Sequence, residues 1–428
     1  MTAYIGNLET RNTRFTFEGL RDFIVALIFI SSFYVKIEPA PTDFLAMLAI
    51  LLFVRSGLHF SRYFAAPLFF LIIFLVAGLI SVIPIDTPSF HAGSSSPYQY
   101  FFGLAFTSAT GIFIAAYVAA NPMRNYLMIE KAYWIAATIG SILGLLTYLQ
   151  IEPFLYFNNN FGDNDLGTNL YRVHGGYKDP NVFSTWLVFP IISMMQAIMV
   201  GRLRASFVSV ASFLTMLIAL LLAFSRGAWI DATGAAILTI GLSVVFAHSV
   251  QLKGRLILWS AVGILVFVII IVGLLSVPSI QNAFQDRFVL VKSYDAGETG
   301  RFGNQLNSIP LLLGLPLGFG PYQFQEVFGE APHNTFLNSF ASGGWLGGLA
   351  YAMLFVTNVV IAVQVIFTRS KFQMIAIAIY ATFLVMTLQG LQIDNEHWRH
   401  LYWLMGMGWG LFAAMKEQES DHVVLRSL

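Results

Sequence analysis

The residues best suited to chemistry are a few cations that lie beside glycines or prolines. Arg172, His174 and Lys178 stand within seven positions of one another, around Gly175-Gly176. Three groups that carry or can acquire positive charge are typical of an anion-binding segment, and a solvated loop is the alternative interpretation. Directly after them, Asp179-Pro180 predicts the start of a helix, because Asp is a favoured N-cap and proline fits the first turn.

A further arginine, Arg226, lies in the short sequence Ser225-Arg226-Gly227-Ala228 that joins two apolar stretches. If those stretches are in a membrane, an arginine at that depth costs about 2.5–3.5 kcal/mol on insertion scales. Snorkelling to the headgroups or pairing with Asp231 would relieve that cost. In the other interpretation Arg226 faces a polar cavity and binds an anion, because its planar donor fork suits a phosphate.

A histidine that could act as a base lies further along, in Ala331-Pro332-His333-Asn334-Thr335. Pro332 predicts a first helical turn, which places His333 and Asn334 at a helix N-terminus. The free N–H groups there attract phosphate and disfavour a protonated imidazole. The usual pKa of about 6.5 already permits a neutral imidazole, which is what a general base requires. A purely structural histidine is the alternative.

The other candidates are less defined by their surroundings. Arg301 follows Gly300 in a long polar segment that also contains Arg287, and Arg399 and His400 belong to a dense charged turn at 394–400 whose role stays open. The sequence contains no phosphate-binding loop, dinucleotide fingerprint or zinc-spaced cluster. The carboxylates are scattered, so we expect no metal and no cofactor.

The composition defines the elements that must position these residues. Hydrophobic residues make up 57% of the 428 and charged residues 11%, against about 45–50% and 25% in soluble domains. So few charges cannot cover so much apolar surface, which predicts a polytopic membrane protein. The balance of 23 basic and 22 acidic residues argues against a nucleic-acid partner, which needs a basic face. The absence of cysteine excludes disulfides and thiolate sites.

The apolar stretches predict an all-α integral membrane fold of about twelve transmembrane helices that forms one domain, 1–428. A span needs about 20 apolar residues, and we place spans at 22–37, 40–54, 66–84, 99–120, 126–149, 182–200, 206–224, 228–247, 256–277, 345–367, 372–389 and 399–415. Lysines and arginines concentrate in the short loops on one side, which predicts that both termini are cytoplasmic. Two long loops, 151–181 and 278–344, then lie outside. The larger joins the ninth and tenth spans and is expected to contain short helices, and loops of such length are usually functional.

In their order and sidedness these motifs resemble the O-antigen ligase/Wzy-type polymerase superfamily of bacterial membrane glycosyltransferases. The resemblance covers roughly residues 170–410. It rests on Arg172 with Gly176, Asp179-Pro180-Asn181, the hairpin 225–228, Arg301, the sequence Pro-Leu-Gly-Phe-Gly at 316–320, and His333-Asn334 followed by Gly344.

The resemblance implies a GT-C-like enzyme of the bacterial inner membrane with a periplasmic active site and an undecaprenyl-diphosphate-linked oligosaccharide as donor. It implies that Arg172 and Arg226, joined by Arg301, bind the diphosphate, and that His333 activates the acceptor hydroxyl. His174, Lys178, Asn334, Arg399 and His400 are further candidates for substrate binding. Direct attack on the anomeric carbon would invert it, and no metal is required if arginines supply the positive charge.

The acceptor separates two reactions in this superfamily. A polymerase adds the glycan to another repeat unit, whereas an O-antigen ligase adds it to lipid A–core. The turn 396–400 is more similar to that of the exopolysaccharide polymerases, which favours polymerase. Besides the lipid bilayer, a protein that regulates chain length is a candidate partner.

A twelve-helix transporter or flippase is the alternative from another class. Such proteins commonly consist of two related halves, whereas here the longest loop follows the ninth span rather than the sixth. Asp231 is nearly the only buried acid available for proton coupling. Both points favour the enzyme.

Overall fold

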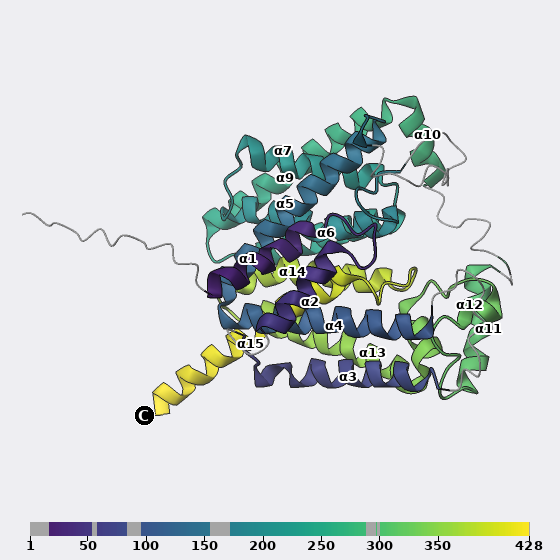
Figure 1. Ribbon diagram of the computed structural model, residues 1–428. Helices are drawn as coiled ribbons and strands as arrows, with labels where there is room; N and C mark the ends of the chain where they lie inside the picture. The colour runs from purple at the N-terminus through teal and green to yellow at the C-terminus, as the bar shows by residue number, and fades with distance from the viewer. Residues whose placement is uncertain are drawn as a thin grey trace, which may run out of the picture.

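The computed structural model describes residues 17–53, 58–83, 96–154, 172–287, 297 and 300–427. Over these residues the protein is a bundle of α-helices that run back and forth between two ends (Figure 1). We name them the terminal end, where α1 begins and α15 finishes, and the loop end, where α11 and α12 lie. The helices are α1 (Phe17–Ser31), α2 (Pro41–Phe53), η1 (Arg62–Phe64), α3 (Ala65–Ile80), α4 (Pro97–Ala120), α5 (Pro122–Tyr148), α6 (Pro180–Val200), α7 (Phe207–Leu222), α8 (Arg226–Val245), α9 (Val250–Leu275), α10 (Pro278–Arg287), α11 (Arg301–Leu313), α12 (Phe324–Phe328), α13 (Thr335–Phe367), α14 (Gln373–Gln389) and α15 (Arg399–Ser427).

The chain is a multi-pass membrane protein. In the described part, seven helical segments are long and apolar enough to cross a membrane: η1 with α3, and α4, α5, α6, α8, α9 and α13. Helices α2, α7 and α14 are apolar but shorter. A helix occupies each of the twelve predicted segments, but that all twelve cross the bilayer stays a prediction, as does the orientation.

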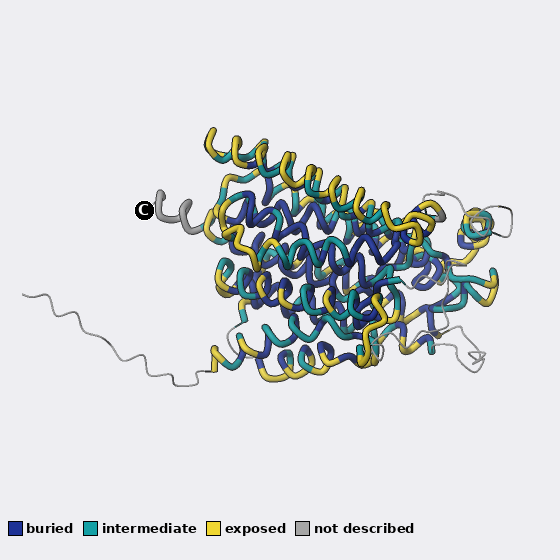
Figure 2. Tube along the Cα trace, turned by 90° about the horizontal axis from the view of Figure 1, so that it is seen from above, coloured by how far each residue is buried: buried dark blue, intermediate teal, exposed yellow. Residues whose placement is uncertain are grey.

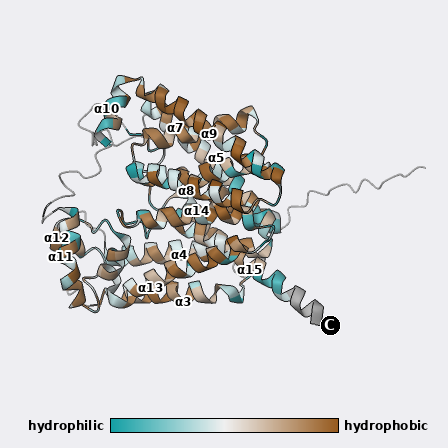
Figure 3. Ribbon diagram, turned by 180° about the vertical axis from the view of Figure 1, so that it is seen from behind, coloured by the Kyte–Doolittle hydropathy of each residue, from teal (hydrophilic) through white to brown (hydrophobic). Residues whose placement is uncertain are grey.

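The apolar surface of the bundle faces outward, as lipid requires. Helix α9 is exposed along its length (Figure 2), and Leu256 is its one buried residue. The helices of the bundle are mostly hydrophobic in sequence, with hydrophilic stretches mainly toward their ends (Figure 3). A helix that is apolar all round and still exposed would aggregate in water but is stable against acyl chains.

Close helix packing holds the interior together. The backbones of α4 and α15 approach so closely that a Cβ atom on Gly406 would collide with the carbonyl oxygen of Gly111. Trp186 on α6 and Trp409 on α15 are fully buried. These contacts fix the helices whose ends carry the candidate site.

Two predicted boundaries were wrong. The span predicted at 22–37 ends at Ser31, because the backbone N–H of Val35 bonds the carbonyl of Gly176 at 2.9 Å instead of continuing the helix. The first helical turn predicted at Pro332 is absent there, since α13 begins three residues later, at Thr335. The pair Gly343-Gly344 in the sequence predicts a helix break, and α13 has one at Gly344, where φ is +64°. Only glycine adopts that conformation readily.

Candidate active site

The segment that begins at Arg172 is fixed to the start of α6. Asp179 is the N-cap of α6, as predicted, and its carboxylate accepts the N–H of Asn181 at 2.7 Å. The Nδ1 atom of His174 lies 2.7 Å from the carbonyl oxygen of Tyr177, and the imidazole is buried. Burial lowers the pKa of His174, so this ring is neutral near pH 7 and has a partner within its own loop.

Arg172 brings this segment to the turn between α7 and α8. Its Nε donates to the carbonyl of Ala223 at 2.9 Å, and its guanidinium also reaches Asn181 Oδ1 at 2.8 Å and the carbonyl of Phe224 at 3.5 Å. Arg226 follows two residues later as the first residue of α8. Two candidate cations that are distant in sequence therefore flank the same turn.

The end of α14 joins this turn to the start of α13. Gly227 lies so close to Gln389 that a Cβ atom would collide with its side-chain nitrogen. The next residue, Gly390, accepts the N–H of Thr335 through its carbonyl at 2.6 Å. Thr335 begins α13, two residues after His333. One helix end thus contacts both the helix of Arg226 and the segment that carries the candidate base.

His333 is held in an unusual backbone conformation by a carboxylate. Its φ is +49°, in the left-handed region that non-glycine residues rarely adopt. The N–H groups of His333 and Asn334 donate to the two oxygens of Asp394, at 3.0 and 2.9 Å. Asn334 caps α13, since its side chain accepts the N–H of Leu337 at 3.1 Å. Strained residues of this kind cluster at functional sites and persist only where their surroundings fix them.

A second carboxylate, that of Glu396, is buried in the same turn as Asp394. Glu396 is 2% exposed and accepts from Asn338 at 2.7 Å, Thr335 at 3.2 Å and Tyr100 at 3.3 Å. Burial, with the charge of Glu396, raises the pKa of Asp394 to about 7. The support of His333 therefore titrates near neutral pH. The sequence marks this turn by its density of charge, but nothing in it indicates that Asp394 bonds the backbone of His333.

The two bonds from the backbone N–H groups of His333 and Asn334 to Asp394 predict opposite pH trends for activity and for stability. A protonated carboxyl is a weaker acceptor, so we expect activity to fall as the pH drops below about 7. Because the pKa of Asp394 is raised in the folded state, its contribution to stability is largest below the unfolded pKa of about 3.9 and is lost as the pH rises through about 7. Transfer rates and thermal unfolding, both measured from about pH 5 to about pH 8, test the two trends.

Asp394→Asn is the matched variant for this prediction. It should lower the rate and remove the pH trend in stability, because the amide does not titrate and directs its NH2 group at one of the two backbone N–H donors. Glu419→Gln, an exposed change near the terminal end, should leave both unchanged. An Asp394→Asn chain whose thermal stability keeps the native dependence on pH would contradict this role.

Other candidates lie in different surroundings. Arg301 begins α11, and Gln305 one turn later donates to the carbonyl of Pro332 at 2.8 Å, so this helix contacts the residue before His333. Lys178 is exposed and pairs with Glu38 at 3.3 Å. Asp231, considered from the sequence as a partner for Arg226, is buried, and its Oδ2 makes no hydrogen bond within the described part of the chain.

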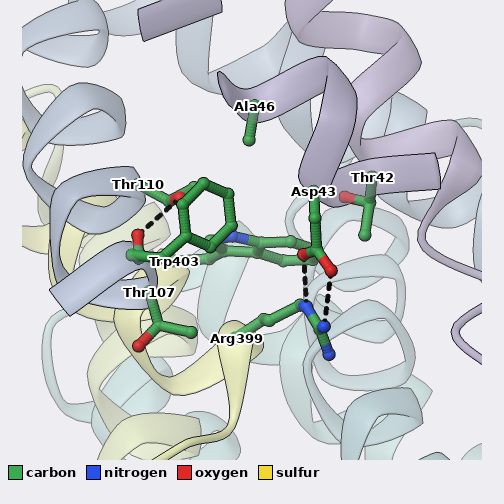
Figure 4. Close-up of a pocket in the computed structure, with 8 residues that line it drawn as sticks. Thr42, Asp43, Ala46, Thr107, Thr110, Arg399 and Trp403 are labelled. Atoms are coloured by element: carbon green, nitrogen blue, oxygen red, sulfur yellow. Dashed lines mark hydrogen bonds and ion pairs between the residues drawn. The ribbon is translucent and has the colours of Figure 1, made fainter. Parts of the chain in front are cut away.

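Arg399 is engaged in an internal ion pair. Its Nε and a terminal nitrogen each lie 2.6 Å from an oxygen of Asp43, at the start of α2 (Figure 4). The pair lines a cavity with Thr107, Thr110 and Trp403 that has room for about one water molecule. The next residue, His400, is buried with its ring 5.3 Å from that of Trp398. Through these contacts Arg399 joins the start of α15 to the start of α2.

Asp43→Ala and Arg399→Ala should therefore destabilise the protein to a similar extent. Removing one partner of a fully buried pair costs about 3–5 kcal/mol, and we expect less here because the Arg399 side chain keeps 26% exposure. Thermal unfolding of both single variants and of the double variant measures this, with the double variant no worse than either single one. Loss of glycan assembly in Arg399→Ala at unchanged Tm would instead indicate a role at the substrate.

The comparisons with known proteins agree with the sequence motifs. No curated protein matches the chain. Residues 211–352 match the family model described as O-antigen ligase. The matched region extends from α7 into α13 and contains Arg226, Arg301, His333 and Asn334. The matched region is about a third of the chain, and this domain supports membership in the O-antigen ligase/Wzy-type family and a glycosyltransferase activity of the ligase or polymerase type.

Proposed function

We propose that this protein transfers an undecaprenyl-diphosphate-linked glycan to a sugar hydroxyl at the loop end of the bundle, on the periplasmic side, as a polysaccharide polymerase. The observation that carries the proposal is the position of the α14 end. It contacts the start of α8, which carries Arg226, through Gly227, and the start of α13, two residues after His333, through Thr335.

The proposed reaction assigns one task to each group. The acceptor oxygen attacks the anomeric carbon, and the bond from that carbon to the diphosphate oxygen breaks with its electron pair on the lipid diphosphate. His333 takes the hydroxyl proton, and the configuration inverts. Arg172 and Arg226, with Arg301, stabilise the charge that grows on the leaving group. This mechanism obtains the positive charge from guanidinium groups and uses no metal ion.

A fixed backbone at His333 supports its role as the base. A general base must stay within hydrogen-bond reach of the proton that it removes. Asp394 holds the N–H groups on both sides of the left-handed residue, so the imidazole projects from a rigid point. Small displacements of a reacting group are costly in rate.

An O-antigen ligase is the second candidate, favoured by the description of the matched family. Donor and site chemistry are the same in both, and only the acceptor differs. Deleting the protein from its host and separating the surface glycans on a gel distinguishes them. A single repeat unit left on lipid A–core identifies a polymerase, whereas long chains stranded on the lipid carrier identify a ligase. Unchanged glycans would exclude both.

A further inference from the structure

Helix α11 has the opposite amphipathicity to that of a helix on a water-soluble protein. Its buried positions are Asn304, Ser308 and Leu312. One outward stripe is apolar, with Leu306 at 66% and Leu313 at 67% exposure and with Phe302 and Ile309 also exposed, and Asn307 is the exposed polar residue beside it. A surface helix in water turns its apolar stripe to the core. Here the apolar stripe faces away from the protein.

The polar side of α11 is used within the protein, which explains this orientation. The Asn304 side chain donates to Glu330 at 3.0 Å and to the carbonyl of Phe328 at 3.4 Å. Gln305 donates to the carbonyl of Pro332 at 2.8 Å. These bonds fix the helix to the segment that leads to His333, so α11 cannot rotate its leucines inward without breaking them.

The exposed apolar stripe lies near the ends of two membrane-spanning helices that also expose apolar residues: α13 bonds α11 directly, and α3 bonds the segment that follows it. The Ser81 hydroxyl at the end of α3 donates to the carbonyl of Leu317 at 2.7 Å, and Trp345 Nε1 on α13 donates to the carbonyl of Leu312 at 2.8 Å. Trp345 is 44% exposed, and Leu346 beside it is exposed as well. Helix α11 lies across the loop ends of α3 and α13 (Figure 1).

We propose that α11 is an interfacial helix that lies in the plane of the membrane, with Phe302, Leu306, Ile309 and Leu313 in the boundary between headgroups and acyl chains. An amphipathic helix at the level where transmembrane helices end meets this boundary. A partly exposed tryptophan beside it is typical of the same level. The position of the stripe near the ends of α3 and α13 selects lipid as the occupant over a soluble partner protein.

This position has a consequence for the active site, which rests on the proposed function. Through Gln305 and Pro332, α11 sets the height of His333 relative to the bilayer surface. The diphosphate of a lipid-linked donor lies at that surface, because its polyprenyl chain stays in the hydrocarbon. An anchored α11 therefore keeps the base at the level of the reacting bond.

The absence of cysteine allows a direct test with single-cysteine variants of the full chain. We would attach a nitroxide at Leu306→Cys in nanodiscs of phosphatidylethanolamine and phosphatidylglycerol. Leu346→Cys on α13 is the lipid-exposed control, and Glu326→Cys, an exposed site on α12, is the water-exposed control. Relaxation by oxygen, which partitions into lipid, is compared with relaxation by a water-soluble nickel chelate.

We expect the label at 306 to match the label at 346, with oxygen the stronger relaxant, and the label at 326 to show the reverse. A label at 306 that responds to nickel like the one at 326 would place the stripe in water and overturn the proposal. Exclusion of both relaxants would indicate a covering protein and overturn it equally. The readout does not depend on transfer, so an active His333→Ala chain would refute the proposed function and leave this test intact.

Discussion

His333→Ala should lower glycan transfer by about 10²–10⁴-fold, the contribution of a positioned general base. The residue lies before the first turn of α13, and its backbone contacts to Asp394 do not involve the imidazole. Replacement should therefore leave the fold and the membrane insertion intact. Polymer formation in vivo and single-turnover transfer in vitro from a lipid-linked donor measure the loss, and protein abundance is followed in parallel.

His248→Ala provides the matched control. This histidine is exposed and lies between α8 and α9 at the terminal end, away from α13. The same substitution there should leave transfer unchanged. Normal polymer in His333→Ala would remove this residue from the mechanism. Equal losses in both variants would point to a general effect on expression.

The helical scaffold could be predicted because the bilayer leaves few options. Each backbone polar group in hydrocarbon must be satisfied within its own segment, so long apolar stretches become helices. Local signals were also sufficient at Asp179, where the N-cap and the following proline act within one turn, and at Gly344, where glycine permits a break in α13.

Contacts between distant segments could not be predicted from one sequence. The end of α1 is an example: apolar residues continue past Ser31, but the N–H of Val35 bonds the carbonyl of Gly176, a residue far away in the sequence. Asp43 and Arg399 are likewise hundreds of positions apart and form one ion pair.

The turn 394–400 shows the same limit for function. Its charge was visible in the sequence and supported a resemblance to polymerases, but its residues proved to have internal partners. Glu396 binds the start of α13, Arg399 binds α2, and Asp394 holds His333. This turn therefore bears on the proposed catalysis indirectly, because Asp394 fixes the backbone at His333.

Arg226→Ala should be the second severe change, with a loss of about 10²–10³-fold in transfer, the usual effect of removing one donor that stabilises developing charge. Arg226→Lys should recover only part of this, because an ammonium lacks the planar fork that binds a diphosphate through two parallel bonds. Arg172 is a less clean test, since its guanidinium also bonds Ala223 and Asn181 and its loss would disturb the turn before α8.

Arg204→Ala is the control for this series, because Arg204 is exposed in the connection between α6 and α7 at the terminal end. If Arg226 binds the leaving diphosphate, its loss should reduce the rate of the chemical step at saturating donor, and Arg204→Ala should behave like the native chain. Full activity in Arg226→Lys would show that charge alone is sufficient there. Full activity in Arg226→Ala would remove Arg226 from the diphosphate site and leave Arg172 as the candidate cation at the turn between α7 and α8.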